Sequence, residues 1–109
     1  MFPKKKRVTK DLFQAIMKHG KILPSSFFVF RYIKQNNPQY AFVAPKSVAK
    51  SATERNKLRR LGYNALSLYP ISSCAGIFFY KKEAKKASLA EIRLDIKVIL
   101  DKAHIPYIK

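Results

Sequence analysis

The stretch that decides the fold runs from Lys46 to Tyr69 and reads KSVAKSATERNKLRRLGYNALSLY. At about 100° per residue its apolar side chains fall on one side, which predicts a helix from about Ala52 to Tyr69. Pro70 is expected to end that helix. The side predicted to be buried consists of Leu58, Leu61, Ala65, Leu68 and Tyr69. One face of the helix is therefore committed to a hydrophobic core.

The other side of this helix gathers positive charge. Helical spacing collects there Arg55, Asn56, Arg59, Arg60 and Tyr63. Arg55 and Arg59 stand at i and i+4, where like charges destabilise a helix by about 0.2–0.5 kcal/mol, and no acid stands where it would relieve them. Phosphates supply the missing negative charge, and Arg side chains match phosphate oxygens with paired donors. We therefore favour nucleic-acid binding over the alternative, an ordinary solvated helix face.

The composition points to the same class of partner. The chain has 109 residues, enough for a single domain with one core. Its 23 Lys and Arg residues stand against six Asp and Glu residues, which gives a formal net charge of +17. A domain this basic repels itself unless a polyanion neutralises it, so nucleic acid or an anionic membrane is the expected partner. Residues 1–8 are expected to form a flexible basic arm.

A membrane location is disfavoured. The sequence contains no apolar run near the ~20 residues that span a bilayer. Its first ten residues are basic and lack the apolar segment of a signal peptide. Cys74 is the only cysteine, so an internal disulfide is impossible, which fits a reducing cytosol. Among apolar neighbours, Cys74 is expected to be a small buried side chain. These features predict a cytoplasmic protein.

One helix and two strands are predicted before the basic stretch. Thr9 is expected to cap a helix whose apolar stripe ends before Gly20, a glycine placed as one that follows a helix. Residues 27–33 (FFVFRYI) and 40–44 (YAFVA) are rich in aromatic and β-branched side chains, which favours strands. The turn signal Asn36-Asn37-Pro38 between them predicts that the two strands form a hairpin.

A third strand and a last helix are predicted after the basic stretch. The strand covers residues 77–80 (IFFY). Ser88 and Glu91 have the spacing of a capping box, which opens a helix that extends to about Ala103. The predicted element order is αββαβα. Such an order indicates an α+β fold in which a small sheet is packed by helices.

The basic stretch resembles the signature of the bacterial ribonuclease P protein family. Lys46-Ser47-Val48-Ala49-Lys50 is similar to the family's basic turn SKKVGKA, and the ERNKLRR run of residues 54–60 is similar to its RNR motif, RNRIKRRLRE. The segment from Asp11 to Gly20 resembles the family's first helix, DFQKVFKHG. Residues 28–31 and 42–44 resemble its first two strands, and residues 88–103 its last helix. The resemblance covers nearly the whole chain.

This resemblance implies a fold and a function. The implied fold is a two-layer α/β sandwich with a small central sheet and a left-handed βαβ crossover into the RNR helix. The implied role is the protein subunit of the endoribonuclease ribonuclease P, which removes the 5′ leader of precursor tRNA. In that family the RNA subunit and its Mg²⁺ ions carry the chemistry. The protein is therefore expected to bind the ribonuclease P RNA and precursor tRNA as a monomer, with no cofactor, metal or catalytic residue of its own.

The resemblance also implies which residues bind. The side chains matched to RNA binding are Lys46, Lys50, Arg55, Asn56, Lys57, Arg59 and Arg60. A leader cleft between the first helix and the open sheet face is expected to include Phe13, Met17 and Arg31. Phe13 is expected to stack on a leader base, with a purely core role for Phe13 and Met17 as the alternative. Gly62 costs a helix about 1 kcal/mol relative to Ala, which indicates a bend or a close backbone approach.

Three other functions are alternatives to this one. A self-sufficient nuclease needs clustered metal ligands, but only Glu91 and Asp95 share a helical spacing, and His19 and His104 are isolated. A ribosomal or other structural RNA-binding protein is disfavoured only by the RNR spacing. Residues 3–8 (PKKKRV) mimic a nuclear localisation signal of a DNA-binding factor, although short lysine runs also serve RNA-binding arms.

Overall fold

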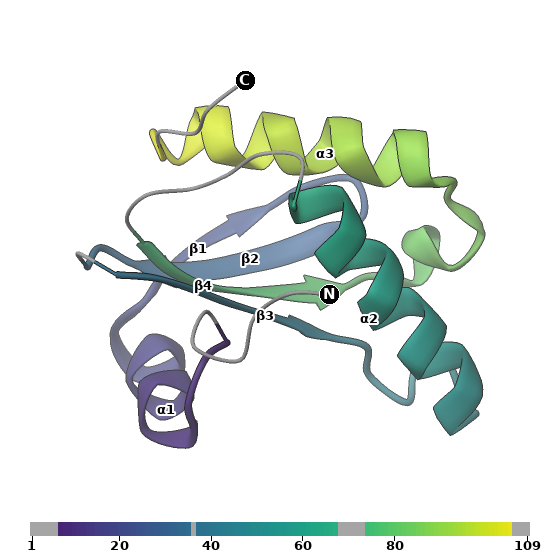
Figure 1. Ribbon diagram of the computed structural model, residues 1–109, viewed down its shortest axis with the longest axis horizontal. Coiled ribbons are helices and arrows are strands. Elements are labelled where there is room, and N and C mark those ends of the chain that lie inside the picture. The colour runs from purple at the N-terminus through teal and green to yellow at the C-terminus, as the bar shows by residue number, and fades with distance from the viewer. Residues whose placement is uncertain (1–6, 36, 68–73, 106–109) are drawn as a thin grey trace.

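A four-stranded mixed sheet lies between helices in the computed structural model, which describes residues 7–35, 37–67 and 74–105 (Figure 1). The fold is mixed α/β, as predicted, and it contains two elements that the sequence did not predict, strand β1 and the 3₁₀ helix η2. In chain order the elements are α1 (Lys10–His19), β1 (Lys21–Pro24), β2 (Phe28–Ile33), β3 (Pro38–Val43), α2 (Ala52–Leu66), β4 (Cys74–Tyr80), η2 (Lys82–Lys86) and α3 (Leu89–Lys102).

The strand order is β1-β2-β4-β3. The hairpin predicted between residues 27–33 and 40–44 is wrong, because β4 lies between β2 and β3. It pairs antiparallel with β2 and parallel with β3. The hairpin partner of β2 is instead β1. The physical reason is burial: six of the seven residues of β4 are buried, so this strand belongs in the sheet interior, where both of its edges are paired.

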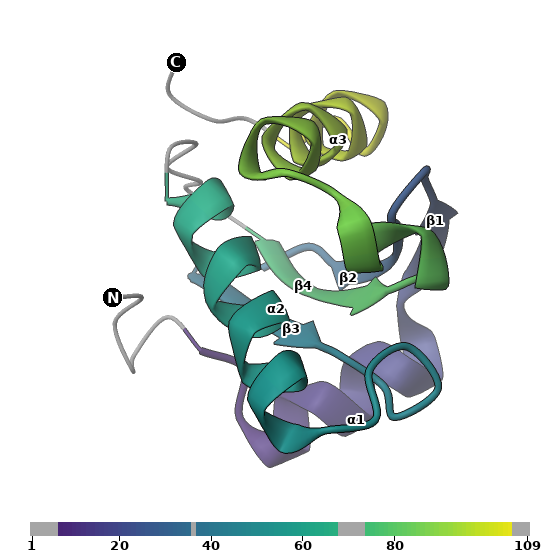
Figure 2. The same ribbon diagram turned by 90° about the vertical axis from the view of Figure 1, so that its right-hand side faces the viewer.

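The parallel pair β3 and β4 requires a crossover connection, and α2 provides it. In Figure 2 the carboxyl ends of these strands face the viewer, and the chain passes from β3 to α2 on the left and then to β4 above β3. This path is a left-handed crossover, the rare hand among βαβ units. It places α2 along the open side of β3, where its outer face remains uncovered by the sheet.

The two faces of the sheet carry different helices. On one face, α2 and α3 pack on alternating aromatic side chains, among which the rings of Phe42 and Phe78 stack with centroids 4.6 Å apart. On the other face, Ile16 of α1 packs against Ala75 and Ile77 of β4. Figure 1 shows α3 above the sheet and α1 below one end of it. The large core therefore lies under α2 and α3, and the face beneath α1 is only partly covered.

The predicted helix starts are confirmed at atomic detail. The Leu12 N–H donates to Thr9 Oγ1 at 3.3 Å. Ser88 and Glu91 form the predicted capping box, with backbone-to-side-chain hydrogen bonds of 3.0 and 3.2 Å. The C-terminal end of α2 is at Leu66. Residues 68–70, which the sequence assigned to the end of this helix, lie outside the described residues.

Gly20 differs from the prediction in its backbone. It lies in the extended region, with φ −70°, and not in the left-handed conformation of a glycine that follows a helix. Its N–H donates to the Ile16 carbonyl at 2.7 Å, and a Cβ at this position would lie 3.2 Å from the Tyr32 carbonyl oxygen. A Cβ would clash first with the Ile16 carbonyl oxygen, so Gly20 is required by the tight fit of the chain against the last turn of α1, from which it turns directly into β1.

Candidate RNA interface

The loop that leads into α2 presents two lysines. The N–H groups of Val48 and Ala49 both donate to the Pro45 carbonyl, at 2.9 and 3.1 Å, and both side chains are buried. This tight turn leaves Lys46 and Lys50 exposed on either side of the buried pair. The sequence folds this way because two small or medium apolar residues anchor the turn between the two charged ones.

Arg55 fastens this loop to the helix. Its Nη1 donates to the carbonyls of Ala49 and Lys50, at 3.1 and 2.7 Å, and the residue is half-buried. Its Nη2 makes no hydrogen bond to any described residue. The guanidinium is thus held in one orientation with donors remaining, at the point where the loop meets α2.

The remaining predicted residues lie exposed along α2. Arg59 Nη2 donates to Asn56 Oδ1, which orients the guanidinium one turn along from Arg55. Lys57 and Arg60 extend from the neighbouring positions into solvent. The structure therefore brings the whole predicted RNA-binding set together on one loop and one helix. We call this set the basic ridge: Lys46, Lys50, Arg55, Asn56, Lys57, Arg59 and Arg60.

The basic ridge has no carboxylate of its own. Glu54, the nearest acid in sequence, forms an ion pair with Lys85 of η2 at 3.7 Å and accepts a hydrogen bond from Ser51 Oγ. This is the only ion pair between residues of the described ranges 7–35, 37–67 and 74–105. Because the cations of the ridge repel one another without internal compensation, a bound polyanion lowers their electrostatic energy.

Tyr63 does not lie on the ridge, which corrects the helical-wheel prediction. Its ring packs edge-on against Phe42 of β3, with centroids 5.0 Å apart, and its Oη accepts a hydrogen bond from the Phe42 N–H at 3.4 Å. The Arg7 guanidinium lies over the same ring, 5.8 Å from its centroid. Tyr63 therefore joins α2 to β3 and to the end of the N-terminal segment. The sequence assigned Arg7 to a flexible arm of residues 1–8, of which residues 1–6 lie outside the described residues, and nothing local relates Arg7 to position 63.

Gly62 sets how closely α2 approaches the sheet. A Cβ at this position would lie 2.5 Å from Tyr80 Oη and 2.6 Å from Phe42 Cε2, which confirms the close approach that the sequence suggested. The Tyr80 hydroxyl donates to the Leu58 carbonyl of α2. Burial raises the pKa of Tyr80, so its hydroxyl keeps its proton and remains a donor. Together these contacts fix the position and height of the ridge above the sheet.

The residues predicted to bind the leader also lie together. Phe13 of α1 is half-buried and packs edge-on against Phe79 of β4, with centroids 6.2 Å apart. Met17, one turn along, is 39% exposed. Arg31 of β2 reaches this helix, where its Nη1 donates to the Met17 carbonyl at 3.4 Å. Phe13 therefore has one side in a small core and part of its surface accessible, which is compatible with both roles considered for it.

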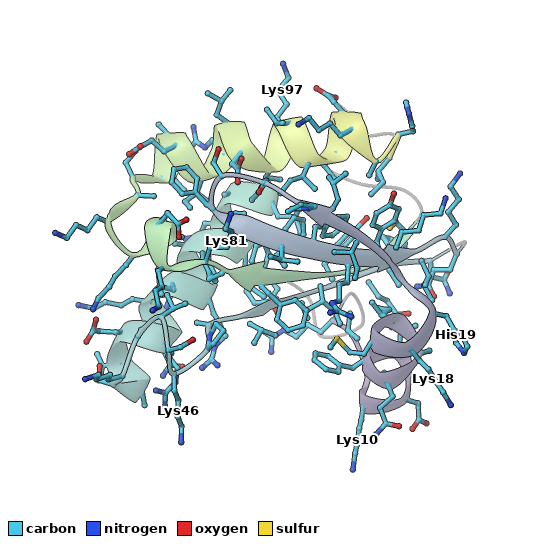
Figure 3. All side chains as sticks on the ribbon, turned by 180° about the vertical axis from the view of Figure 1, so that it is seen from behind. Lys10, Lys18, His19, Lys46, Lys81 and Lys97 are labelled. Carbon is cyan, nitrogen blue, oxygen red and sulfur yellow. The ribbon has the colours of Figure 1, made fainter. Side chains whose placement is uncertain are left out.

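Phe79 is a residue of this face that the sequence pattern did not single out. Successive residues of a strand point to opposite faces, and Phe78 belongs to the core under α2 and α3, so Phe79 must face α1. Cations flank the same face. In Figure 3, Lys10 and Lys18 extend from α1 on one side and Lys46 extends from the α2 loop on the other. An aromatic surface flanked by positive charge is suited to single-stranded nucleic acid.

Metal ligands and membrane spans are the other features that would change the class of site. The described residues contain no group of three or more His, Cys, Asp or Glu side chains that could hold a metal ion. No helix in the described part of the chain is both long and apolar enough to cross a bilayer.

Comparison with known proteins identifies the family. The ribonuclease P family profile matches residues 2–104. A mutant Staphylococcus aureus RNase P protein with defective mRNA degradation activity is similar in fold, with a TM-score of 0.82 and 21% identity over 94% of this chain and 91% of that one. Another Staphylococcus aureus structure shows 22% identity over 100% and 99% of the two chains, with a TM-score of 0.76.

The fold is also shared with a protein from a second bacterium. The Thermotoga maritima RNase P protein aligns with a TM-score of 0.76 and 21% identity, covering 88% of this chain and 94% of that one. A comparison with curated protein sequences gave no match. The family profile spans both the basic ridge and the face beneath α1, and nearly the whole of the described chain. On that match, the chain belongs to the ribonuclease P protein family.

Proposed function

We propose that this protein is the RNA-binding subunit of ribonuclease P, which holds the catalytic RNA with its basic ridge and the 5′ leader of precursor tRNA with the face beneath α1. Membership of the family gives it a role in ribonuclease P and in tRNA processing, with the ribonuclease P RNA as its partner. The observation that carries the proposal is the ridge of cations without a carboxylate, described above.

The ridge binds the backbone of the RNA subunit. Arg and Lys contacts to phosphate fix the position and orientation of a nucleic acid without reading its sequence. Arg55 and Arg59 are already oriented, by the loop carbonyls and by Asn56, so they lose little side-chain freedom on binding. Exposed Lys57 and Arg60 add charge on the outer side of the helix. This combination favours a structured RNA, whose phosphates lie at fixed spacing.

The leader of precursor tRNA binds beneath α1. Leaders differ in sequence from one tRNA to the next, so their binding site must accept every base. Stacking on an aromatic ring does so and contributes about 1–3 kcal/mol per base. Phe13 offers such a ring, Phe79 supports it from behind, and Arg31 lies beside it to contact the phosphates. The protein thereby adds affinity for precursor tRNA over mature tRNA, which lacks the leader.

Cleavage itself is assigned to the RNA subunit and its Mg²⁺ ions. The protein contributes by screening phosphate repulsion between the two RNAs and by positioning the leader, and it acts as a monomer in the cytoplasm before assembly. Screening by six cationic ridge side chains reduces the Mg²⁺ concentration that the RNA needs to fold and to bind its substrate.

Reconstitution tests the proposal. The protein is added to a bacterial ribonuclease P RNA at low Mg²⁺, and cleavage of precursor tRNA is followed with time. We expect cleavage to require both components and the double variant Lys57→Ala/Arg60→Ala to need at least about tenfold more protein. The matched control is Lys82→Ala/Lys86→Ala, which removes the same charge from exposed positions of η2 and should behave like the wild type.

Two results would contradict the proposal. Cleavage of precursor tRNA by the protein alone would assign the chemistry to the chain itself. Equal losses in the ridge variant and the η2 control would mean that only total charge matters. A pull-down from cells adds an independent measurement, because enrichment of ribosomal RNA over ribonuclease P RNA would favour the structural RNA-binding alternative.

A further inference from the structure

The pocket between the β1–β2 hairpin and α3 takes no part in the proposed function. Its lining residues belong to the β1–β2 hairpin and to α3, and in Figure 2 the strand β1 lies on one flank of α3 and the helix α2 on the other. Its volume is about 270 Å³, and its lining consists of Ser26, Phe27, Glu91, Leu94, Asp95 and Val98. A ligand bound there leaves the ridge accessible.

Asp95 gives this pocket a buried carboxylate without a cationic partner. Only 7% of the residue is exposed. Ser25 Oγ and the Phe27 N–H both donate to Asp95 Oδ2, at 2.6 and 3.0 Å. Oδ1 accepts no hydrogen bond from the described residues, whose one ion pair joins Lys85 to Glu54. Oδ1 is not one of the fully buried unpaired atoms, so it is an acceptor that a ligand in the pocket can reach.

The rest of the lining combines a second carboxylate with apolar side chains. Glu91 uses Oε1 in the capping box, where the Ser88 N–H donates to it at 3.0 Å, and its second oxygen remains for a ligand. Leu94 and Val98 are 63% and 38% exposed, and Phe27 is half-buried. Large exposed apolar side chains beside carboxylates form the lining expected for an organic cation with an apolar body.

None of the described cations forms an ion pair with Asp95. Lys81, which Figure 3 shows beside the hairpin, donates from Nζ to the Ser25 carbonyl at 2.9 Å. Arg93 and Lys97 lie two residues from Asp95 in either direction, and at about 100° per residue they project from the opposite side of α3. The pocket therefore contains a carboxylate that no described side chain of the protein pairs with directly, although Lys81 lies next to it on Ser25.

We propose that this pocket binds a planar N–H-donating cation, an amidinium or a guanidinium, carried on an apolar body. The cation donates to Asp95 Oδ1 and to Glu91, because planar groups with paired donors match carboxylate oxygens. The apolar body lies against Phe27, Leu94 and Val98. A small molecule and an arginine side chain of another protein offer the same chemistry, and the net charge of +17 keeps the affinity weak.

Titration of the free full-length protein, followed by ¹H–¹⁵N NMR, tests this site. Benzamidine is the small-molecule probe, N-acetyl-arginine amide is the side-chain probe, and benzamide is the neutral control. We expect benzamidine to shift the amide signals of the hairpin and of the middle of α3, and to bind about tenfold tighter than benzamide. The tighter of the two cationic probes then indicates which source the pocket prefers.

Variants make the result decisive. Asp95→Asn keeps an acceptor for Ser25 and Phe27 but removes the charge, and Leu94→Lys places a cation at the rim from an exposed position. Both should weaken benzamidine binding about tenfold, whereas Glu83→Gln, a charge change on η2, should not. Equal binding of benzamide and benzamidine, or unchanged binding in Leu94→Lys, overturns the proposal. No RNA is present, so failure here leaves the function of the ridge untouched.

Discussion

Arg55 and Arg59 illustrate two roles of an arginine side chain, one structural and one confined to the surface. Arg55 is half-buried and bonded to two backbone carbonyls, whereas Arg59 is exposed and bonded only to a side chain of its own helix. A charged donor that bonds to the backbone contributes about 1.5–3 kcal/mol to stability, and an exposed pair on a helix contributes about 0.2–0.5 kcal/mol. The two arginines should therefore differ in what their removal costs.

Arg55→Ala is expected to lower both RNA affinity and the free energy of unfolding, the latter by about 1–2 kcal/mol. Arg59→Ala is expected to lower RNA affinity and to change unfolding by less than about 0.5 kcal/mol. Urea unfolding and a salt titration of RNA binding measure the two effects. The slope of log K against log salt should fall by about 0.7–0.9 for each phosphate that the variant no longer neutralises. An unchanged slope in Arg59→Ala would exclude a phosphate contact for that residue.

At Phe13 the effect on stability can likewise be measured apart from the effect on binding. Phe13→Leu keeps an apolar side chain against Phe79 but removes the aromatic ring, so the free energy of unfolding should change by less than about 1.5 kcal/mol. Affinity for precursor tRNA should nevertheless fall by about 1–3 kcal/mol per stacked base. Mature tRNA serves as the control ligand, and its binding should not change. If both ligands lose affinity equally, Phe13 acts through the core alone.

Cys74 illustrates a residue that burial keeps inert. Burial raises the pKa of its thiol to about 11, from an ordinary 9.0. The uncharged thiol therefore contributes stability below pH 9, and this contribution is lost as the pH rises through 11. At pH 8 only roughly 0.1% of the folded protein carries the reactive thiolate. Labelling by a thiol reagent at pH 8 should thus be slow in the native protein and fast in denaturant; fast native labelling would place Cys74 at the surface.

At the scale of an element, the position of α2 depends on a residue without a side chain. Gly62→Ala gains about 1 kcal/mol of helix propensity but places a Cβ against Phe42 and Tyr80. Overpacking costs about 1–3 kcal/mol and forces α2 outward. The variant is expected to be less stable in urea and to bind RNA more weakly. Ala65 lies on the same buried face, and Ala65→Gly tests propensity without a clash. A Gly62→Ala protein that is more stable than the wild type would refute the close-packing argument.

The type and order of six of the eight elements were predictable from the sequence, but β1, η2 and the pairing of the strands were not. Helix starts follow from local capping chemistry, which Thr9 and Ser88 carry in their own neighbourhoods. Strand pairing is decided by burial over the whole sheet, and nothing near residues 36–38 indicates that β4 will insert between β2 and β3. β1 was not predicted because the strand has only four residues and most of them are exposed, so no alternation of apolar and polar residues marks it.

The ridge was predictable for the same local reason, and its anchoring was not. Helical spacing gave Arg55, Arg59 and Arg60, and the family resemblance added Lys46, Lys50 and Lys57. Tyr63 was misplaced because a helical wheel gives direction but not the identity of the neighbouring strand, and Phe42 is far from it in the sequence. Phe79 was not singled out because its face could be assigned only once Phe78 was known to belong to the larger core.

For the whole molecule, charge opposes the fold. The net charge of +17 is spread over a protein with a Cα radius of gyration of 12.7 Å, and Asp11 is the only acid among its first 53 residues. Self-repulsion of this kind destabilises a compact state and weakens with salt. If the ridge binds RNA phosphates as proposed, a divalent oxyanion should bind there too and so do more than screen. The folded protein should therefore respond to the kind of anion as well as to ionic strength.

Sulfate is expected to raise the melting temperature more than sodium chloride at equal ionic strength. Binding to the folded state stabilises it by RT ln(1 + [L]/Kd), about 2.7 kcal/mol at a hundredfold excess over Kd, and 1 kcal/mol shifts the melting temperature of a domain this size by about 4–8 °C. Calorimetry at matched ionic strength measures the difference. Lys57→Ala/Arg60→Ala should lose part of the sulfate-specific gain, whereas Lys82→Ala/Lys86→Ala should keep it, because only the first pair belongs to the ridge. Equal gains from both salts would reduce the role of the anion to screening, and the ridge would then lack the site for phosphate on which its proposed function depends.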